Sequence, residues 1–222
     1  MRKTKPVAHK VDSLCRVGRT YADYKEFMRC SPVSVVEMDS VIGRVGGKVL
    51  LTLMFNSCDF MLAFIREHNT SQSVIDAFDA LYASLGGETF ASMFPLLLGD
   101  NGSEFSNPRR IEFGREGGRR TRVFYCDPYA SFQKPHEELN HEFLRRILPK
   151  GSSFDSLAQK DIDLMMSHTN SYPRGKWGGK SPVDMFGFLH GYDVLAKLGQ
   201  LRIPAIDILL KPFLLKNGGR QL

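Results

Sequence analysis

The sequence predicts an α/β fold in which helices flank a mixed sheet of five strands. Three short apolar runs follow one another between residues 33 and 65 with only brief turns between them, which is typical of antiparallel strands. Two further apolar runs, at residues 94–98 and 122–126, are separated by segments of different composition. With 222 residues, of which 42% are hydrophobic, the chain is long enough to bury a sizeable core.

The first half of the chain supplies most of the predicted strands. Residues 1–30 are basic and polar, with a possible short helix at residues 21–28, and we interpret them as a linker or arm. Thr70 or Ser71 should cap a helix that ends at Gly86-Gly87. The predicted strands cover residues 33–42, 48–55, 61–65, 94–98 and 122–126, and a loop rich in glycine and arginine covers residues 106–120.

Two helices are expected in the second half. Pro135 suits the first position of a helix over residues 135–148, which has acids in its first turn and arginines in its last. A second helix, at about 156–169, has an apolar face on which His168 is expected to be a core histidine. Three antiparallel strands, a helix, two strands and then helices is the element order of a ribonuclease-H-like fold. We divide the chain into an arm (1–30), a core (31–190) and a C-terminal tail (191–222).

Composition excludes several classes of protein. The four cysteines form no C-x-x-C pair, so neither a zinc knuckle nor a disulfide framework is indicated, and a reducing cytoplasm fits. No apolar run approaches the roughly 18 residues of a membrane-spanning helix. The basic N-terminus lacks the apolar centre of a signal peptide.

Positive charge is concentrated in two segments of a chain whose net charge is +6. Residues 1–29 contain eight Lys or Arg and three acids, and residues 109–122 contain six Arg and two Glu. Clustered arginines are the electrostatic footprint of nucleic-acid binding, although a solubilising surface is the alternative. We predict that Arg115, Arg119 and Arg120 contact DNA.

Three carboxylates are candidates for a metal site. Asp39 interrupts a β-branched run, Asp100 directly follows the apolar run 94–98, and Glu138 lies on the helix that begins at Pro135. Acids at the ends of strands and on an adjacent helix can converge on a pair of divalent metal ions. For Asp100 alone, a solvent-exposed turn formed with Asn101-Gly102 is an equally good reading.

Several motifs, in this order, resemble bacterial insertion-sequence transposases of the insertion-sequence-30 type, within the wider group of DDE transposases and retroviral integrases. The resemblance covers roughly residues 10–215. Full-length members carry helix-turn-helix segments before this catalytic core, so the chain looks truncated. The motifs are Glu37-Met-Asp39-Ser-Val-Ile-Gly43, Asp100-Asn-Gly-Ser-Glu-Phe105, Phe124-Tyr-Cys-Asp-Pro-Tyr-Ala130, Glu138-Leu-Asn-His-Glu-Phe-Leu-Arg145, Leu148-Pro-Lys-Gly151, Asn170-Ser-Tyr-Pro-Arg174 and Ser181-Pro182.

The resemblance implies an enzyme that cuts DNA at insertion-sequence ends and joins those ends to target DNA. Asp39, Asp100 and Glu138 match the family's metal-binding triad, which holds two Mg²⁺ ions, with Mn²⁺ as a substitute. The implied partners are double-stranded DNA, as terminal repeats and as target, and further copies of the chain in a synaptic complex. The implied location is the bacterial cytoplasm, at the nucleoid, and no membrane partner is expected.

The resemblance also suggests residues that contact DNA. Arg145 follows Glu138 by seven residues, two helical turns, and matches a basic residue that contacts the DNA end in the family. Glu142 is expected to pair with Arg145 or Arg146, and Glu37 and Glu104 are expected to be structural. The remaining predicted DNA contacts are Asn140, His141, Arg146, Lys150 and Arg174.

The sequence departs from the family pattern at two places, and two alternatives to the transposase function stay open. Gly99 stands where many relatives carry Thr, and residues 134–137 differ from the usual approach to the helix, which could shift Glu138. One alternative is an inactive, truncated relic that binds DNA or a full-length transposase. The other is a structure-specific nuclease on the same fold, because the fold alone does not decide the activity.

Overall fold

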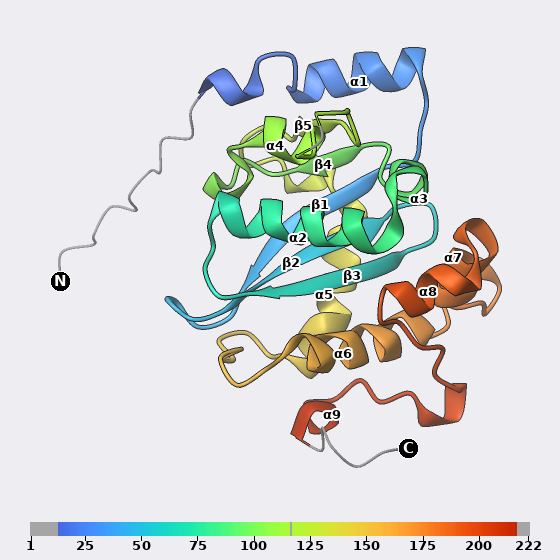
Figure 1. The fold of residues 1–222 in the computed structure, drawn as a ribbon. Coiled ribbons are helices and arrows are strands. Elements are labelled where there is room, and N and C mark those ends of the chain that lie inside the picture. The colour runs from blue at the N-terminus through green and yellow to red at the C-terminus, as the bar shows by residue number, and fades with distance from the viewer. Residues whose placement is uncertain (1–12, 116, 217–222) are drawn as a thin grey trace.

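The computed structural model describes residues 13–115 and 117–216, and for Ser13, Ser131, residues 137–140 and Lys216 it describes the backbone alone. One mixed sheet has the strand order β3-β2-β1-β4-β5 (Figure 1). β1, β2 and β3 pair antiparallel, whereas β1, β4 and β5 pair parallel. This is the ribonuclease-H-like arrangement, and it confirms the predicted fold class. The strands are β1 (Val36–Ile42), β2 (Val49–Phe55), β3 (Phe60–Arg66), β4 (Leu97–Gly99) and β5 (Val123–Tyr125).

Helices cover both faces of this sheet (Figure 1). On one face α2 buries Phe78 in a core cluster with Met38 of β1, and on the other face α5 buries Leu144 in a cluster with Val41 of β1. The alternation of side chains along β1 therefore divides the molecule into two apolar layers. The first face carries α2 (Ser71–Leu85), α3 (Gly87–Met93), α7 (Pro182–His190) and α8 (Tyr192–Lys197), and the second carries α5 (Pro135–Ile147), α6 (Gln159–Ser171) and α9 (Phe213–Lys216).

The predicted cap of α2 is confirmed. The Ser73 backbone N–H donates to Thr70 Oγ1 at 3.2 Å, and the Thr70 N–H donates to Ser73 Oγ at 3.4 Å, which together satisfy two donors that the helix leaves free. Gly86, with φ of 80°, ends the helix as expected. Pro135 likewise begins α5.

The arm predicted for residues 1–30 is in part a packed helix. Residues 1–12 lie outside the described residues, but α1 (Tyr21–Cys30) is packed against the sheet. The ring centres of Tyr24 and Phe27 lie 6.0 and 5.7 Å, respectively, from the ring centre of Phe124 in β5. The predicted tail also contributes to the core, because α8 buries Val194 and Leu195.

Other differences concern short elements. The strand predicted at residues 94–98 begins only at Leu97, because residues 87–93 form α3 and bury Phe90 and Met93 in the core. The loop predicted at residues 106–120 contains α4 (Pro108–Glu112). In the part of the chain that the structure describes, no helix has the length and apolar character needed to cross a membrane. Short 3₁₀ turns cover Ser13–Arg16, Ser103–Phe105, Ser131–Gln133, Gly175–Trp177 and Ala205–Asp207.

Candidate catalytic carboxylate site

Asp39 and Asp100 occupy neighbouring positions at the point where the parallel pairing of β1 with β4 ends. Met38 of β1 pairs with Gly99 of β4, and Asp39 and Asp100 are the next residues along each strand. Adjacent strands lie about 4.8 Å apart, and residues paired across them point to the same side of the sheet. The sheet register thus brings together two of the three carboxylates that the sequence singled out.

The environment of Asp100 holds several charges close together. Burial is the main reason that the pKa of Asp100 is raised, and the negative charges of Asp39 and Glu104 raise it further. The Lys134 ammonium and the Gly102 N–H, which donates to Asp100 Oδ1 at 2.9 Å, act in the opposite direction. Asp100 is therefore a half-buried carboxyl group inside a cluster of charges, and not a fully solvent-exposed turn residue.

Glycine at position 99 has a packing reason. A β-carbon built on Gly99 would lie 2.6 Å from Met38 Cε, because the Met38 side chain occupies that space. Met38 is fully buried. Met38 thus fills the space that a Thr side chain at position 99 would need, and β4 keeps its register with β1.

The segment that carries Glu138 lies beside these acids. Lys134, directly before α5, donates from Nζ to the Met38 carbonyl at 3.0 Å. Further along α5, His141 Nε2 lies 3.4 Å from Thr52 Oγ1, and the Thr52 hydroxyl donates to the Asp39 carbonyl at 3.3 Å. Contacts with β1 and β2 thus flank Glu138 along the chain, whereas the side chains of Glu138 and Asn140 lie outside the described residues.

The described donors suit a hard divalent cation. Asp39 and Asp100 offer carboxylate oxygens, the ligands that Mg²⁺ prefers. The site already attracts a positive charge, because Lys134 Nζ lies 3.7 Å from Asp39 Oδ2. No group of three or more His, Cys, Asp or Glu side chains is placed to hold a metal among the described residues, and that set does not include the side chain of Glu138.

The predicted DNA contacts on α5 have varied surroundings. Arg145 donates to the Ile42 carbonyl at 3.4 Å, and Arg146 pairs with Glu142 at 2.8 Å, the second of the two pairings expected for Glu142. His141 is half-buried against Thr52, whereas Lys150 is exposed. Their contacts with DNA stay predictions.

Arg120 is a correction to the predicted DNA-binding surface. Its guanidinium is buried, lies 2.7 Å from Asp79 Oδ1, and donates to the carbonyls of Ile111 and Arg110 at 2.9 and 3.2 Å. A DNA phosphate needs an exposed guanidinium, so we withdraw Arg120 from the predicted set. The side chains of Arg115 and Arg119 are 79% and 41% exposed, as the prediction requires.

Asp59 connects the glycine-rich loop after α6 to the start of α5, a link that the sequence analysis missed. This buried carboxylate accepts from Lys176 Nζ at 2.6 Å and from Trp177 Nε1 at 3.2 Å. His136 Nδ1, in the first turn of α5, lies 3.2 Å from the other carboxylate oxygen. Asp59 has a φ of 54°, a left-handed conformation that Asp and Asn adopt more readily than most residues.

Arg174 supports the same helix from the side. Its guanidinium carbon lies 3.9 Å from the centre of the Phe143 ring, and Nη2 donates to the Thr169 carbonyl at 3.4 Å. Burial lowers the pKa of Arg174 to about 10. These contacts indicate a packing role, and the predicted contact with DNA stays a prediction. His168 is buried as expected, and its Nδ1 accepts from the Leu209 N–H at 3.1 Å.

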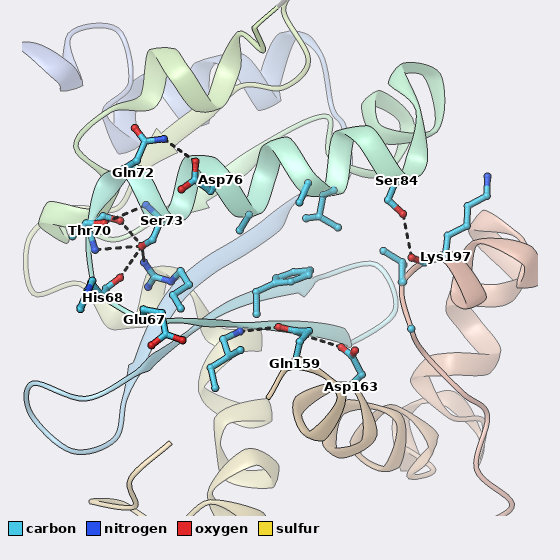
Figure 2. Close-up of a pocket in the computed structure, with 18 of the residues that line it drawn as sticks. Glu67, His68, Thr70, Gln72, Ser73, Asp76, Ser84, Gln159, Asp163 and Lys197 are labelled. Atoms are coloured by element: carbon cyan, nitrogen blue, oxygen red, sulfur yellow. Dashed lines mark hydrogen bonds between the residues drawn. The ribbon is translucent and has the colours of Figure 1, made fainter. Parts of the chain in front are cut away.

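A large pocket lies away from the carboxylates. It has a volume of about 870 Å³ and runs along the outer edge of β3, between α2, α6 and α8 (Figure 2). Two backbone groups on the outer edge of β3 find hydrogen-bond partners there, because Gln159 accepts from the Ile65 N–H and donates to the Ala63 carbonyl, both at 2.9 Å. Such a cover blocks pairing with another strand. Asp39 lies on an inner strand and does not line this pocket.

Comparison with known proteins gives related sequences. The chain is 28% identical over 158 residues to a putative integrase, ORF3, of Spiroplasma virus SpV1-R8A2 B, covering 71% of the chain and 47% of that protein. It is 24% identical over 151 residues to the transposase of insertion sequence element IS4351 of Bacteroides fragilis, covering 68% and 44%. It is 29% identical over 115 residues to the transposase InsI of insertion sequence element IS30A of Escherichia coli K12, covering 52% of the chain and 28% of that protein. The chain is similar to IS30-type transposases.

The likeness to IS30-type transposases covers a part of those proteins. The chain spans less than half the length of each of these three relatives. No protein-family model matches it. A simian T-cell lymphotropic virus intasome in complex with a PP2A regulatory subunit aligns with a TM-score of 0.38 and 13% identity, covering 51% of the chain and 38% of that chain. A likeness this weak supports no argument about the fold.

Proposed function

We propose that this chain is the catalytic region of a DDE-type transposase, which cleaves DNA at insertion-sequence ends and joins those ends to target DNA. The observation that carries the proposal is the pairing of Met38 with Gly99, which sets Asp39 beside Asp100 where the parallel pairing of β1 with β4 ends. The segment bearing Glu138 crosses the same region, and the sequence is similar to transposases.

The proposed site would hold two Mg²⁺ ions between Asp39, Asp100 and Glu138. Bound there, such ions supply Lewis-acid activation of the attacking oxygen and stabilise negative charge at phosphorus. The chain's own contribution is positioning. Thr52 fixes the backbone of Asp39, the Gly102 N–H orients one oxygen of Asp100, and contacts of His141 and Arg145 with the sheet hold α5 in place.

The proposed substrate is double-stranded DNA, as insertion-sequence terminal repeats and as target. Exposed arginines such as Arg115 and Arg119 would bind its phosphates without sequence preference. Self-association in a synaptic complex, and work at the bacterial nucleoid, belong to the same proposal.

Replacing the three acids one at a time tests this proposal. Glu138→Gln, Asp39→Asn and Asp100→Asn should each lower metal-dependent cleavage and strand transfer by about a thousandfold or more, because each removes a charged ligand from a unit that works together. The assay uses supercoiled plasmid carrying insertion-sequence ends, with Mg²⁺ or Mn²⁺. A DNA-reading domain is fused to the chain if the chain alone is inactive.

Neighbouring acids provide matched controls. Successive helix residues point about 100° apart, so Glu137→Gln should leave activity within about twofold. Glu142→Gln should reduce activity partially, through its lost pairing with Arg146. Full activity of Glu138→Gln would contradict the assignment. Nicking without joining by the unmodified chain would favour a nuclease, and no activity in any format would favour an inactive relic.

A further inference from the structure

Lys134 has an unusual position for a lysine. Only 8% of its side chain is exposed, and lysine is almost never buried unless its charge is paired. Nζ donates to the Met38 carbonyl at 3.0 Å and lies 3.7 Å from Asp39 Oδ2. The residue stands directly before α5, so the fold delivers an ammonium group into the carboxylate site at the point where that helix begins.

The surroundings of this ammonium are those that a metal ion would have. Asp39 and Asp100 are adjacent in the sheet register, so two negative charges would otherwise repel each other in a partly desolvated region. The ammonium offsets this repulsion, and it faces a carboxylate oxygen and a main-chain carbonyl. Both are oxygen ligands of the type that a hard divalent cation uses.

We infer that the Lys134 ammonium occupies a cation position of the carboxylate site and competes with a divalent metal ion for it. The inference rests on the proposed metal site. A divalent ion bound to Asp39 would lie within a few ångströms of the ammonium, and like charges at that distance repel strongly in a protein interior. Metal binding therefore requires the Lys134 side chain to move away from Asp39, and the metal-free chain keeps a neutralised site.

A purely structural lysine makes the opposite prediction. If Lys134 only tethers α5 to the Met38 carbonyl, removing it loosens the helix that carries Glu138 and weakens metal binding. If Lys134 competes with the metal, removing its charge strengthens metal binding. The sign of the change in affinity separates the two.

Mn²⁺ binding to Lys134→Met measures that sign. Methionine keeps a chain of similar length without the charge. Free Mn²⁺ is followed by electron paramagnetic resonance, and folding is checked by thermal melting. We expect Kd to fall by about tenfold or more, in keeping with the loss of a like charge near the metal. An unchanged or higher Kd in the folded variant would overturn the inference.

Lys48→Met is the matched control. Lys48 is also largely buried, with 21% of its side chain exposed, and it pairs with Glu67 at 3.0 Å. Lys48 lies directly before β2, so its substitution removes the same net charge from the turn between β1 and β2 and alters no contact of Asp39 or Asp100. The Kd of Lys48→Met for Mn²⁺ should stay within about twofold of the value for the unmodified chain. An equal fall in Kd in Lys48→Met and Lys134→Met would show that the effect comes from net charge alone, and would overturn the inference.

Asp39→Asn separates failure of this inference from failure of the proposed function. It should abolish Mn²⁺ binding both alone and combined with Lys134→Met. Mn²⁺ binding that survives Asp39→Asn, or no binding to either the unmodified chain or Lys134→Met, would contradict the metal site itself and the inference with it. Asp39-dependent binding that Lys134→Met leaves unchanged would contradict the inference alone.

A second measurement on the unmodified chain applies if Lys134→Met does not fold. The rate at which an amine-specific acetylating reagent modifies Lys134 is followed by mass spectrometry, with and without saturating Mn²⁺. Displacement of the ammonium from its buried position should raise this rate several-fold, while the rate at Lys48 stays constant. A Lys134 rate that is unchanged or lowered by Mn²⁺ would overturn the inference.

Discussion

At the scale of single residues, burial decides which arginines of the 109–122 segment are available to a ligand. Arg120 donates to main-chain carbonyls and pairs with Asp79 inside the molecule, and its guanidinium lies 5.5 Å from the centre of the Tyr82 ring. Arg115 and Arg119 reach the surface from the same loop. One basic stretch thus supplies both a core-stabilising ion pair and a charged surface.

Single alanine substitutions should separate these two roles. Arg115→Ala and Arg119→Ala should each lower the salt dependence of DNA affinity by about one counterion, and leave the free energy of unfolding within about 0.5 kcal/mol. Arg120→Ala should cost about 3 kcal/mol of unfolding free energy, because it breaks a buried charge pair.

Fluorescence anisotropy with duplex DNA over a range of KCl concentrations, and urea unfolding, provide the two measurements. A salt slope that is the same in Arg115→Ala, Arg119→Ala and the unmodified chain would show that this loop is only a solvated surface.

The same scale shows where prediction from the residues ends. Asp39 and Asp100 could be found because a carboxylate within or after a strand breaks the apolar pattern. Lys134 could not, because a lysine before a helix looks like any exposed cation until the packing of α5 buries it. For the same reason the sequence does not distinguish Arg120 from Arg119.

At the scale of elements, α5 is the helix whose placement matters most for the proposed site. Its bounds follow from its sequence, since Pro135 sets the start and two arginines fill the last turn. The way in which α5 is attached to the rest of the fold does not follow from its sequence. It depends on a contact of His136 with Asp59, which lies 77 residues away along the chain. Contacts between distant segments have no local signature.

Asp59→Asn tests this attachment. Asparagine tolerates the left-handed backbone at this position but removes the charge that faces Lys176 and His136. We expect a loss of about 2 kcal/mol of unfolding free energy and faster amide hydrogen exchange in the first turns of α5.

Asp76→Asn is the control for that experiment, because Asp76 is exposed and accepts a local hydrogen bond from Gln72 at 2.8 Å. Its effect should stay within about 0.5 kcal/mol. Unchanged exchange in α5 of Asp59→Asn would show that the helix is held by its apolar face alone.

Short helices were the elements that the sequence analysis missed. α7 had an available signal, since Ser181 caps the helix and Asp184 completes the capping box, with Pro182 at the first position. α3 had none as clear, because seven residues carry less than two helical turns of periodicity. Its Phe90 and Met93 are positioned by the core that they join.

At the scale of the whole molecule, the order of strands creates the site. The antiparallel meander β1–β3 was predictable from its short turns, whereas the parallel pairing of β1 with β4 is set by crossover packing. That pairing makes Asp39 and Asp100 neighbours, although 61 residues separate them. The helix that bears Glu138, α5, packs against β1.

The central claim is that Asp39, Asp100 and Glu138 hold a pair of divalent ions, and an anomalous diffraction map from crystals soaked in Mn²⁺ tests it most directly. The account predicts two peaks about 4 Å apart, with carboxylate oxygens of Asp39 and Asp100 at about 2.1 Å from the first and an oxygen of Glu138 at the second. Peaks bound elsewhere, or a Glu138 carboxylate more than about 10 Å from Asp39, a separation that a two-metal centre does not span, would contradict it.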